Sequence, residues 1–179
     1  MSLEEVIGEV RKLGPVKLVE ITGGEPMLQE REVVPLMERL LVEGYEVLIE
    51  TSGERPLAEV PKRVHKIVDV KCPGSGEGGS FRPENLKALT SGDEVKFVIS
   101  DRQDYEFARE FVVQHGLEAI CGNVLFSPAF RKDAGPERTA ANCLLDPRQL
   151  VDWILADGLK VRLSLQIHKF IWEPMIKGV

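Results

Sequence analysis

The segment VKLVEITGGEPMLQ, residues 16–29, predicts a strand, then a glycine turn, then the approach to a helix. Thr22 stands where the apolar, β-branched run ends, and Gly23 and Gly24 follow it. Paired glycines allow a positive φ and let the backbone approach a ligand closely. Glu25 adds a carboxylate that suits an ammonium group on a ligand. The same residues are also compatible with a plain turn in which the glutamate caps a helix.

The order of strand and helix continues along the chain. Further strands are expected over residues 46–50, 66–71, 94–100, 124–126 and 161–167. Helices are expected over residues 3–13, over 30–43, between Asp101 and Gly116, and between Asp146 and Asp157. This alternation predicts an α/β fold with a mainly parallel sheet, a partial (β/α) barrel formed as one domain over residues 1–179. In such folds the chemistry lies at the carboxyl ends of the strands.

The composition excludes several classes of protein. The chain has 179 residues, of which 43% are hydrophobic, so it is not generally disordered. No apolar run is long enough for a membrane span, and a net charge of −6 argues against nucleic-acid binding. The cysteines, Cys72, Cys121 and Cys143, lie far apart and lack the spacing of a metal site. We therefore expect buried thiols, no metal ligands and a cytoplasmic location.

Polar residues follow two further strands. Thr51 and Ser52 come directly after the second strand, where they suit either a ligand or a capped turn. Asp69 and Lys71 share one face of the third strand, because alternate residues of a strand point the same way. A charged pair inside a covered sheet needs mutual pairing or a ligand. These residues are therefore candidates for a binding site or for a structural ion pair.

The last expected strand alternates apolar and polar residues. Its polar face comprises Arg162, Ser164, Gln166 and His168, which suits recognition of a polar heterocycle inside a cavity. A solvated edge strand with a neutral histidine would show the same pattern. Two long loops rich in glycine and proline, residues 72–83 and 127–143, are candidate site loops.

Four segments together resemble a known family: GGEP at 23–26, ETSG at 50–53, DVKCPGSG at 69–76 and LSLQIHK at 163–169. GGEP is similar to the motif of radical S-adenosylmethionine (SAM) enzymes, and the set is similar to the 7-carboxy-7-deazaguanine synthases of queuosine and deazapurine biosynthesis. The resemblance implies a homodimeric partial barrel that uses SAM, a [4Fe–4S] cluster and Mg²⁺. It implies conversion of 6-carboxytetrahydropterin to 7-carboxy-7-deazaguanine, with a reductant such as flavodoxin.

The resemblance also implies roles for individual residues. Those expected to bind SAM are Gly23, Gly24, Glu25, Thr51, Ser52, Asp69, Val70, Lys71, Ser75, Ser127 and Pro128. Those expected to bind the pterin substrate are Thr22, Gln166, His168 and Lys169. No catalytic acid or base and no metal ligand is assigned. The family's CxxxCxxC cluster loop does not occur here, so we expect an N-terminally truncated chain that is inactive by itself.

Two other functions are compatible with the residues. A Schiff-base lyase or aldolase on a (β/α) scaffold would use Lys71 or Lys96 as its nucleophile, if burial lowered the pKa of that lysine. A non-catalytic module that binds SAM or forms a dimerising scaffold would need no nucleophile.

Overall fold

The computed structural model describes residues 1–131 and 139–172. Six strands form one all-parallel sheet in the order β1-β2-β3-β4-β5-β6. The strands are β1 (Leu18–Ile21), β2 (Glu46–Thr51), β3 (His65–Asp69), β4 (Glu94–Ile99), β5 (Asn123–Pro128) and β6 (Arg162–Leu163). The α-helices are α1 (Leu3–Lys12), α2 (Glu30–Val42), α3 (Arg102–His115), α4 (Leu117–Ile120), α5 (Pro147–Ala156) and α6 (His168–Ile171). Short 3-10 helices are η1 (Pro26–Gln29), η2 (Pro73–Ser75), η3 (Pro83–Ala88) and η4 (Ala140–Asn142). The expected α/β class and parallel sheet are confirmed.

The longer helices begin where the sequence predicts. Ser2 and Glu5 form a reciprocal capping box at α1, and Asp101 accepts a hydrogen bond from the amide of Asp104 at α3. Asp146 caps α5 through the amide of Arg148. These side chains satisfy amides that a helix leaves free at its start, which is why sequence alone located these helices.

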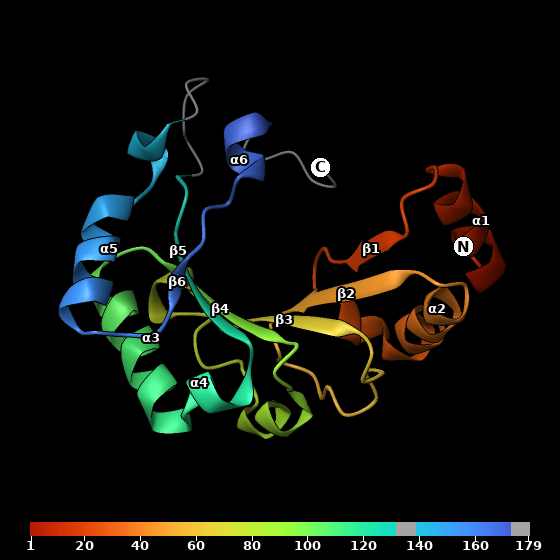
Figure 1. Cartoon of the computed structure of the whole chain (residues 1–179), viewed down its shortest axis with the longest axis horizontal. Helices are drawn as coiled ribbons and strands as arrows, with labels where there is room; N and C mark the ends of the chain where they lie inside the picture. Colours follow the sequence, from red (N-terminus) through yellow and green to blue (C-terminus); the bar gives the residue numbers. More distant parts are fainter. Residues whose placement is uncertain (132–138, 173–179) are drawn as a thin grey trace.

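The two faces of the sheet differ in character. On β4, Val95, Phe97 and Ile99 are buried against the helices, whereas Glu94 and Lys96 on the opposite face are only half-buried. Figure 1 shows the helices that follow the strands gathered along one side of a curved sheet, with α6 on the other side near β5 and β6. Alternation along each strand therefore directs apolar side chains to the helices and polar ones to the open face.

The prediction of the last strand over residues 161–167 is wrong in its length, because the strand in the structure is shorter. The ladder covers only β6 and ends with the amide of Ser164, which donates to the carbonyl of Phe126 at 2.9 Å. The chain then turns, with the amide of Ile167 donating to the carbonyl of Leu165, and His168 begins α6. Leu165 and Ile167 are 40% and 62% exposed. The alternating pattern is typical of a strand, but β6 lies at the sheet edge and no layer formed by the described residues buries these apolar side chains.

The second of the two long loops, residues 127–143, begins later than expected. Ser127 and Pro128 belong to β5, and Phe130 forms an isolated antiparallel bridge with Cys143. Residues 132–138 of the second loop lie outside the described part. Within the described ranges, no helix has the length and apolar character that crossing a bilayer requires.

A fully buried ion pair connects β3 to the turn before β4. Lys66 and Asp93 have side chains that are 1% and 2% exposed, and Lys66 Nζ lies 3.4 Å from Asp93 Oδ2. Asp93 also accepts hydrogen bonds from the Lys66 amide and from the amide and hydroxyl of Thr90. Lys66 Nζ additionally donates to the carbonyl of Val64 at 3.3 Å. This arrangement compensates two charges that burial would otherwise make very costly.

The variant Asp93→Ala is expected to lower the free energy of unfolding by about 3–5 kcal/mol, because it leaves the Lys66 ammonium buried without its carboxylate. Urea denaturation measures this change. Glu9→Ala, which breaks the exposed Glu9–Lys12 pair on α1, is the matched control and should have little effect. Equal losses in the two variants would contradict the role of the buried pair.

Candidate functional site

A cavity of about 840 Å³ lies at the carboxyl ends of β1, β2 and β3. Its lining comprises the residues that follow these strands and the loop from 77 to 80. Among the predicted site residues it contains Thr22, Gly23, Gly24, Glu25, Thr51, Ser52, Asp69 and Lys71. Three sequence-distant motifs therefore meet in one hollow, as expected for neighbouring parallel strands.

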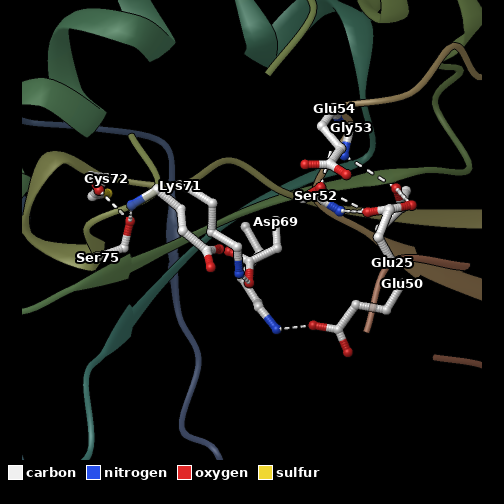
Figure 2. A network of polar contacts seen from close by, with 12 residues as sticks. Glu25, Glu50, Ser52, Gly53, Glu54, Asp69, Lys71, Cys72 and Ser75 are labelled. Carbon is white, nitrogen blue, oxygen red and sulfur yellow. Dashed lines mark hydrogen bonds and ion pairs between the residues drawn. The ribbon is translucent and has the colours of Figure 1, made fainter. Parts of the chain in front are cut away.

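Glu25 connects the glycine turn to the end of β2. Its Oε1 accepts hydrogen bonds from the amide of Met27 at 3.0 Å and the hydroxyl of Thr51 at 2.7 Å. Its Oε2 accepts from the amide of Ser52 at 2.8 Å and the hydroxyl of Ser52 at 2.7 Å. Figure 2 shows Glu25 directed at Ser52 and the Gly53 turn. A carboxylate has about four acceptor sites, so these bonds saturate Glu25 within the protein.

Because of these hydrogen bonds, the carboxylate of Glu25 has no free acceptor site for a ligand. Glu25 caps η1, which is the helix-capping alternative that the sequence left open. The hydroxyl protons of Thr51 and Ser52 are directed at Glu25 rather than into open space. These three side chains line the cavity but are bonded to one another, so the backbone of Gly23 and Gly24 is the part of the motif that a ligand can approach most closely.

The glycine turn requires glycine for conformation and leaves space beside it. Gly23 and Gly24 have φ values of +89° and +55°, which side chains other than glycine rarely adopt. A Cβ built on either residue would have no protein atom within 4 Å. Any crowding at this turn would therefore come from a ligand and not from the fold.

Two lysines of the open face form ion pairs. Lys71 Nζ lies 2.8 Å from Asp69 Oδ2, and Lys96 forms an ion pair with Glu50 (Figure 2). Burial alone lowers the pKa of Lys71, but the charge and hydrogen bond of Asp69 outweigh it and raise the pKa above its usual value. A lysine held in its charged form is a poor amine nucleophile, so the geometry disfavours Lys71 as a Schiff-base residue.

A second cavity of about 520 Å³ adjoins the first through Asp69 and Lys71, which line both. It extends toward β5 and the segment after β6. The predicted site residues in its lining are Asp69, Val70, Lys71, Ser75, Gln166 and Lys169. Two hollows that share residues form a continuous surface over the strand ends.

Three buried polar atoms near this second cavity have no hydrogen-bond partner among the described residues. They are Asp69 Oδ1, Ser127 Oγ and Gln166 Oε1. Asp69 and Ser127 are 8% and 1% exposed. Asp69 and Gln166 line the second cavity, whereas Ser127 lies on β5 and lines neither cavity. Because buried polar atoms are normally satisfied, the two unpartnered atoms at the second cavity indicate that a polar ligand completes it.

Four predicted residues are placed less favourably. Two of them, Ser127 and Pro128, belong to β5 and line neither cavity. His168 lies on α6, is exposed and lines neither cavity. Partial burial lowers the pKa of His168, and the positive charges of Lys169 and Lys96 lower it further. The hydroxyl of Ser75 donates to the carbonyl of Cys72 and accepts from the amide of Glu77, so it serves its own loop.

The sequence analysis missed two residues that form hydrogen bonds with the backbone of the site loops but line neither cavity. Asn85 accepts from the amide of Leu57 and donates to the carbonyls of Gly53 and Arg55. Asp104 on α3 accepts from two loop amides. Neither residue belongs to a motif or follows a strand, so the sequence carried no signal for it.

The cysteines do not converge. Cys72 follows β3 at the site, whereas Cys121 precedes β5 and lies at the opposite end of the sheet. Burial raises the pKa of all three thiols, and Asp104 adds to this effect at Cys72. In residues 1–131 and 139–172, no group of three histidine, cysteine or acidic side chains could hold a metal ion.

No family model matches the chain. It is 69% identical to 7-carboxy-7-deazaguanine synthase from Koribacter versatilis, over all of this chain and 79% of the relative. It is 35% identical to the enzyme of the same name from Chlorobaculum tepidum, over all of this chain and 76% of that relative.

Solved structures show the same fold. QueE from Escherichia coli superposes with a TM-score of 0.67 at 20% identity, over 93% of this chain and 64% of that chain. SuiB from Streptococcus suis, bound to the precursor peptide SuiA, gives 0.54 at 14% identity, over 93% of this chain and 42% of that chain. With full-length identity of 69% to one synthase and the motif residues gathered at the strand ends, the chain belongs to the 7-carboxy-7-deazaguanine synthase family of radical SAM enzymes.

Proposed function

We propose that this chain provides the SAM and pterin sites of an enzyme that forms 7-carboxy-7-deazaguanine from 6-carboxytetrahydropterin. The structural observation that carries the proposal is the trio of buried, unpartnered atoms: Asp69 Oδ1, Ser127 Oγ and Gln166 Oε1. A purine-ribose or pterin ligand offers the donors and acceptors that these atoms lack. The synthase name of the relatives supports the choice of reaction.

The two cavities suit the two ends of SAM. The backbone of Gly23 and Gly24 would receive the methionyl end, where a ligand can approach without meeting a Cβ. The second cavity, which Val70 and Gln166 line, would receive the adenosyl end. Thr22 and Lys71 border the first cavity and are available to the substrate or to the methionyl group.

The chemistry that the bound cofactor supplies is hydrogen abstraction by a 5′-deoxyadenosyl radical. The residues of this chain bind and orient the ligands and exclude water, which are positioning tasks. Such tasks need no titrating side chain, which is consistent with the absence of an assigned acid or base. The described cysteines do not fit a [4Fe–4S] cluster, and no described acidic cluster fits Mg²⁺, so no step is assigned to either on these residues.

The proposal includes the remaining expectations. It includes a homodimer, a one-electron reductant such as flavodoxin, a cytoplasmic setting and a single domain. The outer edge of the sheet supports a protein partner, since Val16 and Leu18 beside β1 are 67% and 53% exposed.

The variant Gly24→Val is expected to abolish SAM binding to the chain, because its side chain would occupy the space where the ligand approaches. Isothermal titration with SAM measures the affinity. Gly44→Val is the matched control: Gly44 also has a positive φ (+80°), and a Cβ there also meets no atom within 4 Å. Both variants should lose similar stability, but only Gly24→Val should lose SAM binding. Unchanged SAM affinity in Gly24→Val would contradict the assignment of the glycine turn to the SAM site.

Substitutions of Gln166 and His168 are expected to differ in their effect on SAM affinity, although the family resemblance assigns both residues to the substrate site. Gln166→Ala removes one of the three unpartnered atoms and should weaken SAM binding about fivefold, equivalent to about 1 kcal/mol. His168→Ala should leave SAM affinity unchanged, because His168 lines neither cavity. Parallel titrations of both variants test this difference. A larger loss of SAM affinity in His168→Ala would overturn the assignment of the second cavity.

Anaerobic reconstitution of this chain with iron and sulfide, followed by SAM and a reductant, is expected to yield no 5′-deoxyadenosine. Cys72 and Cys121 lie at opposite ends of parallel strands, roughly 17–20 Å apart along a strand of average length, too far for one cluster. Chromatographic detection of 5′-deoxyadenosine measures turnover. A stoichiometric cluster with turnover would show that the described cysteines are ligands after all.

A further inference from the structure

We propose that Asp104, a residue of α3 outside every motif, is a positioning residue that fixes the wall of the second cavity and thereby sets the affinity for SAM. The proposal rests on the proposed function, because it takes this cavity as part of the SAM site. Asp104 itself does not line the cavity and touches no ligand.

The Asp104 carboxylate bridges two segments of the cavity wall. Its Oδ1 accepts a hydrogen bond from the amide of Gly74 at 2.8 Å, and its Oδ2 accepts from the amide of Ser100 at 3.0 Å. Gly74 lies in η2, after β3, and Ser100 directly follows β4. Both residues line the cavity. One side chain therefore fixes the separation of two loops that come from different strands.

The environment of Asp104 is specialised for this contact. The side chain belongs to a residue that is 1% exposed, so its charge is compensated by the protein alone. Among the described residues, no lysine or arginine forms an ion pair with it. Asp104 lies in the first turn of α3, where the helix dipole favours a negative charge. The donors to its carboxylate among the described residues are thus backbone amides, and these bonds fix the position of the main chain.

Gly74 fits closely against this carboxylate. A Cβ built on Gly74 would lie 2.7 Å from Asp104 Oδ2 and 3.0 Å from Oδ1, closer than real contacts allow. The turn that carries Cys72 and Ser75 is therefore seated directly on α3. The same turn continues from Asp69 and Lys71 at the end of β3, so a displaced turn would also displace these groups.

The experiment combines hydrogen exchange with SAM titration in four proteins: wild type, Asp104→Asn, Gly74→Ala and Asp101→Ala. Asp104→Asn keeps the shape but has only one acceptor oxygen, so one loop amide would face an NH₂ group. Gly74→Ala pushes the turn away while Asp104 stays intact, and it serves if Asp104→Asn folds poorly. Asp101→Ala is the control, because Asp101 caps the same helix and contacts neither loop amide.

We expect exchange of the Gly74 or Ser100 amide to be about tenfold faster in Asp104→Asn, and SAM affinity to fall about tenfold in both Asp104→Asn and Gly74→Ala. Asp101→Ala should lose stability without either effect. Unchanged exchange at both amides in Asp104→Asn would overturn the positioning role, whether or not SAM binds. Faster exchange with unchanged SAM affinity would overturn the link to the cofactor and would also contradict the assignment of this cavity to SAM. Wild-type chain that fails to bind SAM would contradict the proposed function and, with it, the link between Asp104 and the cofactor, whereas the exchange measurement would still test the positioning role of Asp104.

Discussion

Parallel pairing of consecutive strands is the constraint on which the site depends. Each strand of the sheet pairs with the next strand along the chain, so every strand ends at the same edge. The residues after β1, β2 and β3 thereby line one cavity, although the motifs are separated by 15 residues or more in the sequence. Parallel strands need a long crossover connection. The crossover from β2 to β3, which the structure describes throughout, contains no helix, and the helices of the other crossovers cover one face of the sheet (Figure 1). The opposite face and the strand ends remain open for ligands.

The polar groups of the site fall into two physical classes. Glu25 is saturated by four donors, and Asn85 is similarly occupied by three backbone groups. Such residues hold the framework, because a buried polar group that keeps all its partners has little to offer a ligand. Asp69 and Ser127 are the opposite case, since each has a buried oxygen without a partner. The distinction between these classes, rather than the identity of the motif, indicates where a ligand binds.

Most of the helices and strands could be predicted from the sequence, because capping residues and apolar periodicity mark them. The caps Ser2, Asp101 and Asp146 located three helices, and apolar periodicity located five of the strands. The sixth strand was overextended, because alternation along residues 161–167 cannot reveal whether a neighbouring layer exists to bury the apolar face.

The site was only partly predictable. The gathering of the glycine turn, Thr51 and Asp69 follows from strand order. The direction of the Glu25 carboxylate does not, because a motif fixes residue type and not hydrogen-bond partners. Asn85 and Asp104 act on loops 28 to 32 residues away in the chain, and tertiary contacts at that separation leave no local pattern.

The most direct test of the account is a titration of the isotope-labelled chain with SAM, followed by the chemical shifts of its backbone amides. The account predicts that the largest shifts occur at the carboxyl ends of the strands, at Gly23, Gly24, Val70, Ser127 and Gln166. Amides at the opposite end of the sheet, such as those of Gly92 and Gly122, should be unaffected. Shifts concentrated at Gly92 and Gly122, or a saturating titration that leaves the strand ends unperturbed, would contradict it.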